Sequence, residues 1–328
     1  MPSWIQPFGS DLKIAARRLR RAPTFALGSI AAIALGIGAN ATMFNVIDRL
    51  MLRPPARIAH PENVYTIHAL PRDAISFPAL TNLRGHLGAG VSVTAQTSPW
   101  ELPVGRGDHA HMAQTVFADG GYFRTLGVAA AAGRLLSAND TRLPYGEPVA
   151  VISYGLWQRW FNRDPSVVGR ELIISTIPVQ IVGVVPEDFN GIDRHPVDIW
   201  LPLTLASRLL PGVGPRWPWM TADNGWLRGI TRIAPQIDPR AVSARATALL
   251  QFAAAAHPTR RTATVELHSI LPARAKTFSS QAKIASLLGA ISILVFLIAC
   301  SNATNLMLAR GVRQRREIGM RVALGISR

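Results

Sequence analysis

The stretch that decides the fold is residues 24–47, TFALGSIAAIALGIGANATMFNVI, which contains 24 residues and no charged side chain. At about 1.5 Å per residue, a helix of this length crosses a hydrocarbon layer about 30 Å thick. A second uncharged run, IASLLGAISILVFLIACSNATNLMLA, occupies residues 284–309. We therefore predict a membrane protein with two transmembrane α-helices, one at each of these runs.

The first run also has features of a cleaved signal peptide, because basic residues precede it and Ala39-Asn40-Ala41 has the small-x-small pattern of a cleavage site. The apolar character continues past that site through Met43, Phe44 and Ile47, which favours a membrane span. Cleavage nevertheless stays open as an alternative.

Two sets of residues in these runs are candidates for helix packing in the membrane. Small or amide residues recur every four positions in the first run and share one helix face, a pattern typical of close packing in lipid. The general frequency of Gly and Ala in membrane helices explains the same pattern. In the second run, a polar cluster from Cys300 to Asn305 is expected to face other helices. The candidate packing residues are Gly28, Ala32, Gly36, Asn40, Asn302 and Asn305.

The net charge of +16 is concentrated in the two ends of the chain. Residues 1–23 carry five basic side chains against Asp11, and residues 310–328 carry six arginines against Glu317. Short Lys/Arg-rich segments beside spans stay in the cytoplasm, so we predict both termini inside and residues 48–281 outside the membrane. No basic stripe is interleaved with aromatic residues, which argues against a nucleic-acid partner. The single cysteine, Cys300, excludes an intrachain disulfide.

Residues 48–281 are predicted to form a large extracytoplasmic α+β domain. Apolar runs typical of strands alternate with helical patterns, the clearest of which begins after Asp238 as N-cap with Pro239 in the first turn. A shorter helix, SYGLWQRWF, begins at Ser153 and places three aromatic residues toward the core. Proline-rich breaks at 194–202 and 210–218 indicate two subdomains. The predicted strands are residues 64–67, 91–95, 148–152 and 179–185.

The usual catalytic patterns are missing from the sequence. There is no G-x-x-x-x-G-K-[ST] loop, and Val151 stands where a G-x-S-x-G nucleophile elbow needs glycine. His109 and His111 have strand spacing for metal ligands, but no cysteine or carboxylate cluster completes a site, so a solvated pair is favoured. The tryptophans of RWPWMTADNGW fit either an aromatic binding patch or turn packing. We expect no enzyme activity, cofactor or metal.

Long motifs resemble the MacB/FtsX-like permeases of ABC transporters, especially the duplicated orphan permeases of acidobacterial type. The opening segment DLKIAARRLRRAPTFALGSIAAIALGIGANATMFNVIDRLMLRPP resembles the first helix of that family. The resemblance continues through ADGGYFRTLGVAAAAGRLLSANDT, VAVISYGLWQRWFNRDPSVVGRELIIS, IVGVVPEDFNGI and DIWLPL in the MacB-type periplasmic core domain, and ends in NATNLMLARGVRQRREIGMRVALGISR at the start of the FtsX-like permease domain.

This resemblance implies a type VII, mechanotransmission fold with four spans per permease unit and a partner cytoplasmic ABC ATPase that binds the ATP. It implies a dimer of permease units in the plasma membrane, and it is compatible with a periplasmic adaptor or envelope protein as a further partner. It also implies that the segment after the second helix couples to the ATPase, and a positive-inside membrane anchor is the alternative explanation of its charges. The positions that match the coupling segment are Arg315, Arg316, Glu317, Ile318, Gly319, Arg321, Ala323, Leu324 and Gly325.

The predicted organisation departs from the family after the coupling segment, where a third and a fourth span are expected. A truncated record, a frameshift or a short protein with a complementary chain would each explain the difference. The function expected is a permease subunit, or its N-terminal part, in efflux or mechanotransmission. Alternatives are a non-transporting scaffold that relays an ATPase signal to an envelope enzyme, or an envelope enzyme with two anchors. The predicted segments are 1–23 (cytoplasmic amphipathic), 24–47 (span), 48–281 (periplasmic core), 284–309 (span) and 310–328 (coupling).

Overall fold

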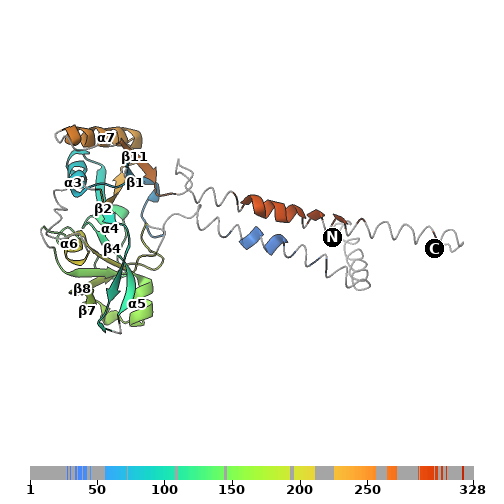
Figure 1. Ribbon diagram of the computed structural model, residues 1–328, viewed down its shortest axis with the longest axis horizontal. Helices are drawn as coiled ribbons and strands as arrows, with labels where there is room; N and C mark the ends of the chain where they lie inside the picture. The colour runs from blue at the N-terminus through green and yellow to red at the C-terminus, as the bar shows by residue number, and fades with distance from the viewer. Residues whose placement is uncertain are drawn as a thin grey trace, which may run out of the picture. The chain divides into compact units, whose positions relative to one another are not determined.

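The computed structural model divides the chain into two compact units, Met1–Leu52 with Phe278–Arg328, and Arg53–Thr277. In the second unit, called the domain below, residues 56–71, 73–107, 110–143, 146–192, 196–210, 225–255 and 264–271 are described. In the first unit, separate helical positions between 28 and 45 and between 287 and 320 are described. Figure 1 shows α3 and α7 together at one end of the domain and α5 at the other.

The domain is a mixed α/β fold. Its elements in chain order are η2 (Pro61–Asn63), β1 (Val64–Leu70), α3 (Phe77–His86), β2 (Val91–Thr97), β3 (Trp100–Val104), β4 (His111–Ala118), α4 (Tyr122–Leu126), β5 (Ala132–Gly133), β6 (Val149–Ile152), α5 (Tyr154–Phe161), η4 (Pro165–Val167), β7 (Glu171–Ile174), β8 (Ile177–Val184), β9 (Ile199–Pro202), η5 (Leu203–Leu205), α6 (Ala206–Leu209), β10 (Leu227–Ile233), α7 (Pro239–Ala255) and β11 (Thr264–Ser269).

The first and last parts of the domain form one half, which we call the split half. Its strands lie in the order β11-β1-β10-β2, and every neighbouring pair is antiparallel. The chain runs β1-α3-β2 and later β10-α7-β11, which is the split βαβ arrangement of ferredoxin-like folds. The helices α3 and α7 contact each other, and α7 also packs on β11.

The segment between β2 and β10 forms the second half, which we call the inserted half. Its strands follow the order β4-β3-β7-β8-β6-β9, and β9 pairs in parallel with β4, so the six strands close into a ring. The ring is joined to the split half through the pairing of Gln96 in β2 with Ala118 in β4. Closure leaves these six strands without an open edge in the ring, which protects them from pairing with other chains.

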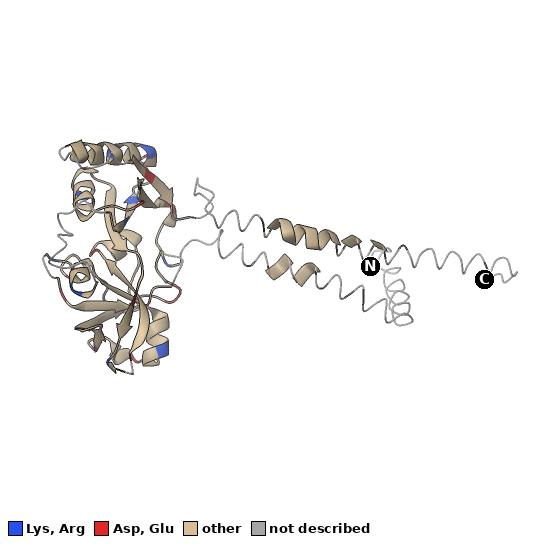
Figure 2. Ribbon diagram, in the orientation of Figure 1, with Lys and Arg blue, Asp and Glu red and all other residues tan. Residues whose placement is uncertain are grey.

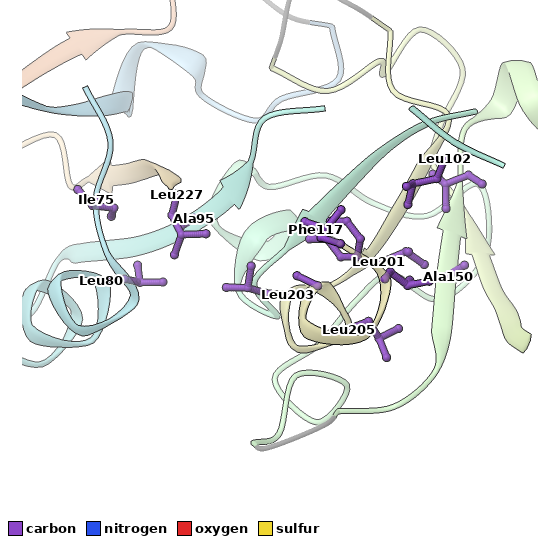
Figure 3. Close-up of a cluster of buried hydrophobic side chains, with 14 of the residues drawn as sticks. Ile75, Leu80, Ala95, Leu102, Phe117, Ala150, Leu201, Leu203, Leu205 and Leu227 are labelled. Atoms are coloured by element: carbon purple, nitrogen blue, oxygen red, sulfur yellow. The ribbon is translucent and has the colours of Figure 1, made fainter. Parts of the chain in front are cut away.

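Side chains of the ring strands alternate between two hydrophobic clusters, because successive residues of a strand point to opposite faces. Phe117, Ala150 and Leu201 belong to a cluster that also contains residues of α3 and α7, and part of this cluster is drawn in Figure 3. Their neighbours Val116 and Trp200 belong to a second cluster. The second cluster contains the aromatic group Tyr122, Phe123, Phe189 and Trp200.

The helix starts follow local capping chemistry. The Asp238 carboxylate accepts a hydrogen bond from Arg240 N at 2.9 Å, and Ser153 Oγ accepts one from Leu156 N at 3.0 Å. Both predicted helices are therefore confirmed as α7 and α5, and the aromatic residues of α5 pack against the first cluster. The four predicted strands are also confirmed, since they match β1, β2, β6 and β8.

One boundary prediction is wrong in its detail. The proline-rich stretch 194–202 is not a break between subdomains, because its last four residues form β9. All four residues of β9 are buried, between β6 on one side and β4 on the other. The other stretch, 210–218, lies outside the described residues except for Leu210. The two halves differ in topology, yet their strands belong to one sheet and their residues to one compact unit.

Candidate functional site

Within the described ranges of the chain, no group of three or more His, Cys, Asp or Glu side chains is arranged to hold a metal ion. His111 lies at the start of β4, where its ring is 5.7 Å from that of Trp160 in α5. His109 and the stretch from Arg216 to Asn224 lie outside the described residues. Trp226 is half-buried and packs against the first hydrophobic cluster. The two predicted alternatives for the three tryptophans, a binding patch and turn packing, therefore both stay open.

Another histidine pair lies in the split half, where sequence reasoning did not place one. The rings of His68 in β1 and His268 in β11 stack with centroids 4.2 Å apart. His68 Nδ1 hydrogen-bonds Asp73, and His268 Nε2 lies 3.1 Å from a Glu266 carboxylate oxygen. Each ring thus has a carboxylate partner close to it in the sequence, and the contact between β1 and β11 is made by the stacked rings.

Asp140 organises the most complete polar network of the inserted half. Its carboxylate, 3% exposed, accepts hydrogen bonds from both terminal nitrogens of Arg134, at 2.7 and 2.8 Å. The backbone N–H and the hydroxyl of Ser137 donate to it as well, each at 2.8 Å. Burial alone would raise the pKa of Asp140, but these four donors outweigh burial and hold the pKa below its usual value.

Asp119 joins the two halves of the domain. It follows β4 in the inserted half, and its Oδ2 accepts hydrogen bonds from Arg84 of α3 at 2.7 Å and Thr94 of β2 at 3.1 Å. The same oxygen accepts from Gly121 N at 3.0 Å, next to the start of α4. Because one oxygen accepts from donors in α3, β2 and the turn before α4, it connects these three elements through a single carboxylate.

A third carboxylate, that of Asp198, stands just before β9. Arg159 of α5 donates to its Oδ1 at 2.7 Å, and Gln114 N of β4 donates to its Oδ2 at 3.1 Å. The three carboxylates lie in the segments quoted above for the family resemblance. Sequence reasoning gave these three carboxylates no role, because a single carboxylate in a loop leaves no periodic pattern in the sequence. The one available signal was an acidic residue close to an arginine in a predicted turn. In Figure 2 the charged residues are spread singly over the ribbon.

The candidate packing residues lie in the first unit. Gly36 is buried and Asn40 half-buried, and Asn40 Oδ1 accepts a hydrogen bond from Ser292 Oγ. Gly28 and Asn305 are exposed. Of the predicted polar cluster, Thr304 Oγ1 bonds to Cys300 O of its own helix at 2.8 Å. Ala32 and Asn302 lie outside the described residues.

All nine positions assigned to ATPase coupling, from Arg315 to Gly325, lie outside the described residues. Their role therefore stays a prediction. Among the positions that the structure does describe, no helix combines the length and the apolar character needed to cross a bilayer. The predicted spans at 24–47 and 284–309 are described only at separate positions.

Comparison with curated proteins finds export proteins. The chain is 28% identical over 207 residues to the macrolide export ATP-binding/permease protein MacB 2 of Aeromonas hydrophila subsp. hydrophila. It is 28% identical over 206 residues to the probable syringafactin export ATP-binding/permease protein SyfD of Pseudomonas syringae pv. syringae. Each match covers 62% of this chain and 29% of the relative, so the chain spans less than a third of their length.

Solved structures also resemble the chain. The periplasmic region of MacB from Actinobacillus actinomycetemcomitans aligns with a TM-score of 0.48 and 17% identity, over 65% of this chain and 90% of that one. The extracellular domain of the noncanonic ABC-type transporter YknZ from Gram-positive bacteria gives 0.46 and 16%, over 62% and 100%. Residues 26–249, more than half of the chain, match the family described as MacB-like periplasmic core domain. The resemblance seen in the motifs is thereby confirmed: the chain belongs to the MacB-like periplasmic core domain family.

Proposed function

We propose that the chain is a permease subunit, or the N-terminal part of one, of a MacB/FtsX-like ABC transporter in the bacterial inner membrane. The match of residues 26–249 to the MacB-like periplasmic core domain carries this proposal. The relatives whose names are given above are both described as export ATP-binding/permease proteins. In the proposed arrangement, the domain lies outside the membrane and responds to a partner ATPase in the cytoplasm.

The described positions of the first unit support the membrane part of the proposal. None of them carries a charged side chain, as Figure 2 shows, and large apolar residues are exposed there. Ile37 is 58% exposed, Leu294 58% and Phe296 44%. Exposed apolar side chains in this density are costly in water but favourable in lipid. We place the spans at residues 24–47 and 284–309, with both termini in the cytoplasm because of their basic residues.

The names of the relatives support the proposed partner ATPase. The chain has no phosphate-binding loop, whereas the relatives combine ATP-binding and permease functions in their names. A separate ATPase would dock on the basic tail, where Ile318, Val322 and Gly325 alternate with charged residues at helical spacing. ATP-driven movement of the tail would then reach the domain through the two helices.

Charge reversal in the tail tests the coupling. We expect Arg315→Glu with Arg316→Glu to abolish co-purification of an ATP-hydrolysing partner while leaving the chain in the membrane. The matched control reverses Arg310 and Arg313, which changes the net charge equally at positions of the tail that are not among the nine assigned to coupling. If both double variants keep the ATPase, or if both lose it together with membrane insertion, the tail is only a positive-inside anchor.

A strain that lacks the gene distinguishes the two candidate functions, transport and signal relay. We expect the strain to accumulate hydrophobic drugs or peptides that the parent strain exports, and the full-length chain to restore export. Unchanged export of the panel together with altered cell-wall hydrolysis would contradict transport and favour a scaffold that regulates an envelope enzyme.

A further inference from the structure

Asn40 and Ser292 join the two hydrophobic segments of the first unit. Ser292 Oγ donates a hydrogen bond to Asn40 Oδ1 at 2.5 Å, across a sequence separation of 252 residues. Both residues belong to the same compact unit. The contact therefore connects the helical positions near residue 40 directly with those near residue 292.

The Asn40 side chain is oriented by its own helix. Its Nδ2 donates to Gly36 O at 2.8 Å, one turn earlier. With the amide nitrogen bound there, the rotation of the side chain is restricted, and Oδ1 is presented away from the helix backbone. Gly36 is buried, so the turn that carries this acceptor lies against other atoms of the unit.

Ser292 differs from the threonines Thr42 and Thr304 of these segments. Thr42 Oγ1 donates to Gly38 O and Thr304 Oγ1 to Cys300 O, each at 2.8 Å and each within its own helix. Such bonds to the residue four positions earlier are the usual solution for a hydroxyl in a helix. Ser292, which is only 8% exposed, instead donates its hydrogen bond to Asn40 in the other segment.

The burial pattern around Ser292 places the polar contact between the helices. Its neighbours Ile291, Ile293 and Leu294 are 46%, 62% and 58% exposed. A small polar residue is thus buried while large apolar residues on both sides of it are exposed. This is the reverse of a water-soluble helix pair and the expected order for two helices in lipid.

We propose that Asn40 and Ser292 are positioning residues that fix the register of the first membrane helix against the second. A slip of one turn, about 5.4 Å, would leave the half-buried Asn40 oxygen without its donor in a medium that offers none. The inference rests on the proposed membrane insertion of both segments. It adds a defined contact through which movement of one helix reaches the other.

Cysteine cross-linking in native membranes tests the register. In a Cys300→Ser chain, Gly36→Cys, at a buried position one turn from Asn40, is combined in turn with Gly289→Cys or Val295→Cys, at half-buried positions on either side of Ser292. We expect one combination to dominate. Ser292→Ala and Asn40→Ala should each lower the preference for that combination about threefold, which corresponds to about 0.6 kcal/mol. The double variant should have no larger effect than either single variant, because both remove the same bond.

Two controls make the outcome specific. Thr42→Ala removes a hydroxyl that bonds within its own helix, and Ser292→Thr keeps a hydroxyl, so both should retain the wild-type pattern. An unchanged pattern in Ser292→Ala and Asn40→Ala, with the chain in the membrane fraction, would overturn the register inference and leave the permease proposal intact. A chain that is not retained in the membrane would overturn both.

Discussion

At the scale of single residues, buried carboxylates determine how the loops of the domain are held. We predict that Asp140→Asn lowers the free energy of unfolding at pH 7 by about 2 kcal/mol, because it removes charge-assisted hydrogen bonds to Arg134 and Ser137. Urea unfolding of the detergent-solubilised chain, followed by tryptophan fluorescence, measures this. Asp188→Asn, at an exposed position, should change the free energy by less than about 0.5 kcal/mol.

The ion pair between Asp140 and Arg134 makes the free energy of unfolding depend on pH. The pKa of Asp140 is lower in the folded chain than in the unfolded one, so its contribution is fully present above the unfolded value of about 4. The contribution is lost as the pH falls through the folded pKa. The difference in unfolding free energy between the wild type and Asp140→Asn should therefore shrink below about pH 4. A difference that grows on acidification would contradict the assigned direction.

Two glycines, Gly183 and Gly85, are predicted to affect the stability of the domain in opposite directions when they are replaced by alanine. A Cβ on Gly183 would lie 2.0 Å from Arg134 O, where β5 and β8 pair. We predict that Gly183→Ala destabilises the domain by about 3 kcal/mol. Gly85 in α3 has no atom within 4 Å of an added Cβ, so Gly85→Ala should raise the free energy of unfolding by about 0.5 to 1 kcal/mol. Equal effects in thermal unfolding would show that the close approach is not a constraint.

At the scale of elements, caps decide where α5 and α7 begin. We predict that Asp238→Ala and Ser153→Ala each cost about 1 kcal/mol, because the first-turn N–H groups lose their acceptors. Asp238→Asn, which keeps an acceptor oxygen, should remain close to wild type. Chemical unfolding of the three variants provides the measurement. A cost for Asp238→Asn equal to that of Asp238→Ala would assign the effect to charge instead of capping.

These elements were accessible to sequence reasoning because their signals are local. The Asp238-Pro239 start, the helix start at Ser153 and the apolar run in β8 each fall within a few residues. The five-residue helix α4 escaped because it is too short for a helical period to show. The stretch 194–202 is predicted as a break because Pro196 and Pro202 are local signals, whereas the pairing of Ile199–Pro202 with β4 and β6 has no local signal.

The pairing of elements could not be read from the sequence in the same way. β1 lies between β10 and β11, which follow it only after the whole inserted half. No local pattern encodes partners so far apart, since their contact depends on the closure of long loops. The polar joint at Asp119 depends on the same closure, because its donors Arg84 and Thr94 come from the split half.

At the scale of the whole molecule, the chain combines a compact domain with two hydrophobic segments and a basic tail at each end. The domain contributes a closed ring and a split βαβ half that are joined through Asp119. The family match covers the first hydrophobic segment and most of the domain. The proposal that depends on these parts together is topological: we propose that the domain lies on the outer side of the membrane and the tails on the inner side.

Cysteine labelling tests this claim most directly. In a Cys300→Ser chain, one variant carries Ala244→Cys, on the exposed face of α7, and another carries Ser327→Cys in the tail. We predict that a membrane-impermeant maleimide labels the Ala244→Cys variant in intact spheroplasts, and the Ser327→Cys variant only after lysis. Labelling of Ser327→Cys in intact spheroplasts, or protection of Ala244→Cys until lysis, would contradict the account.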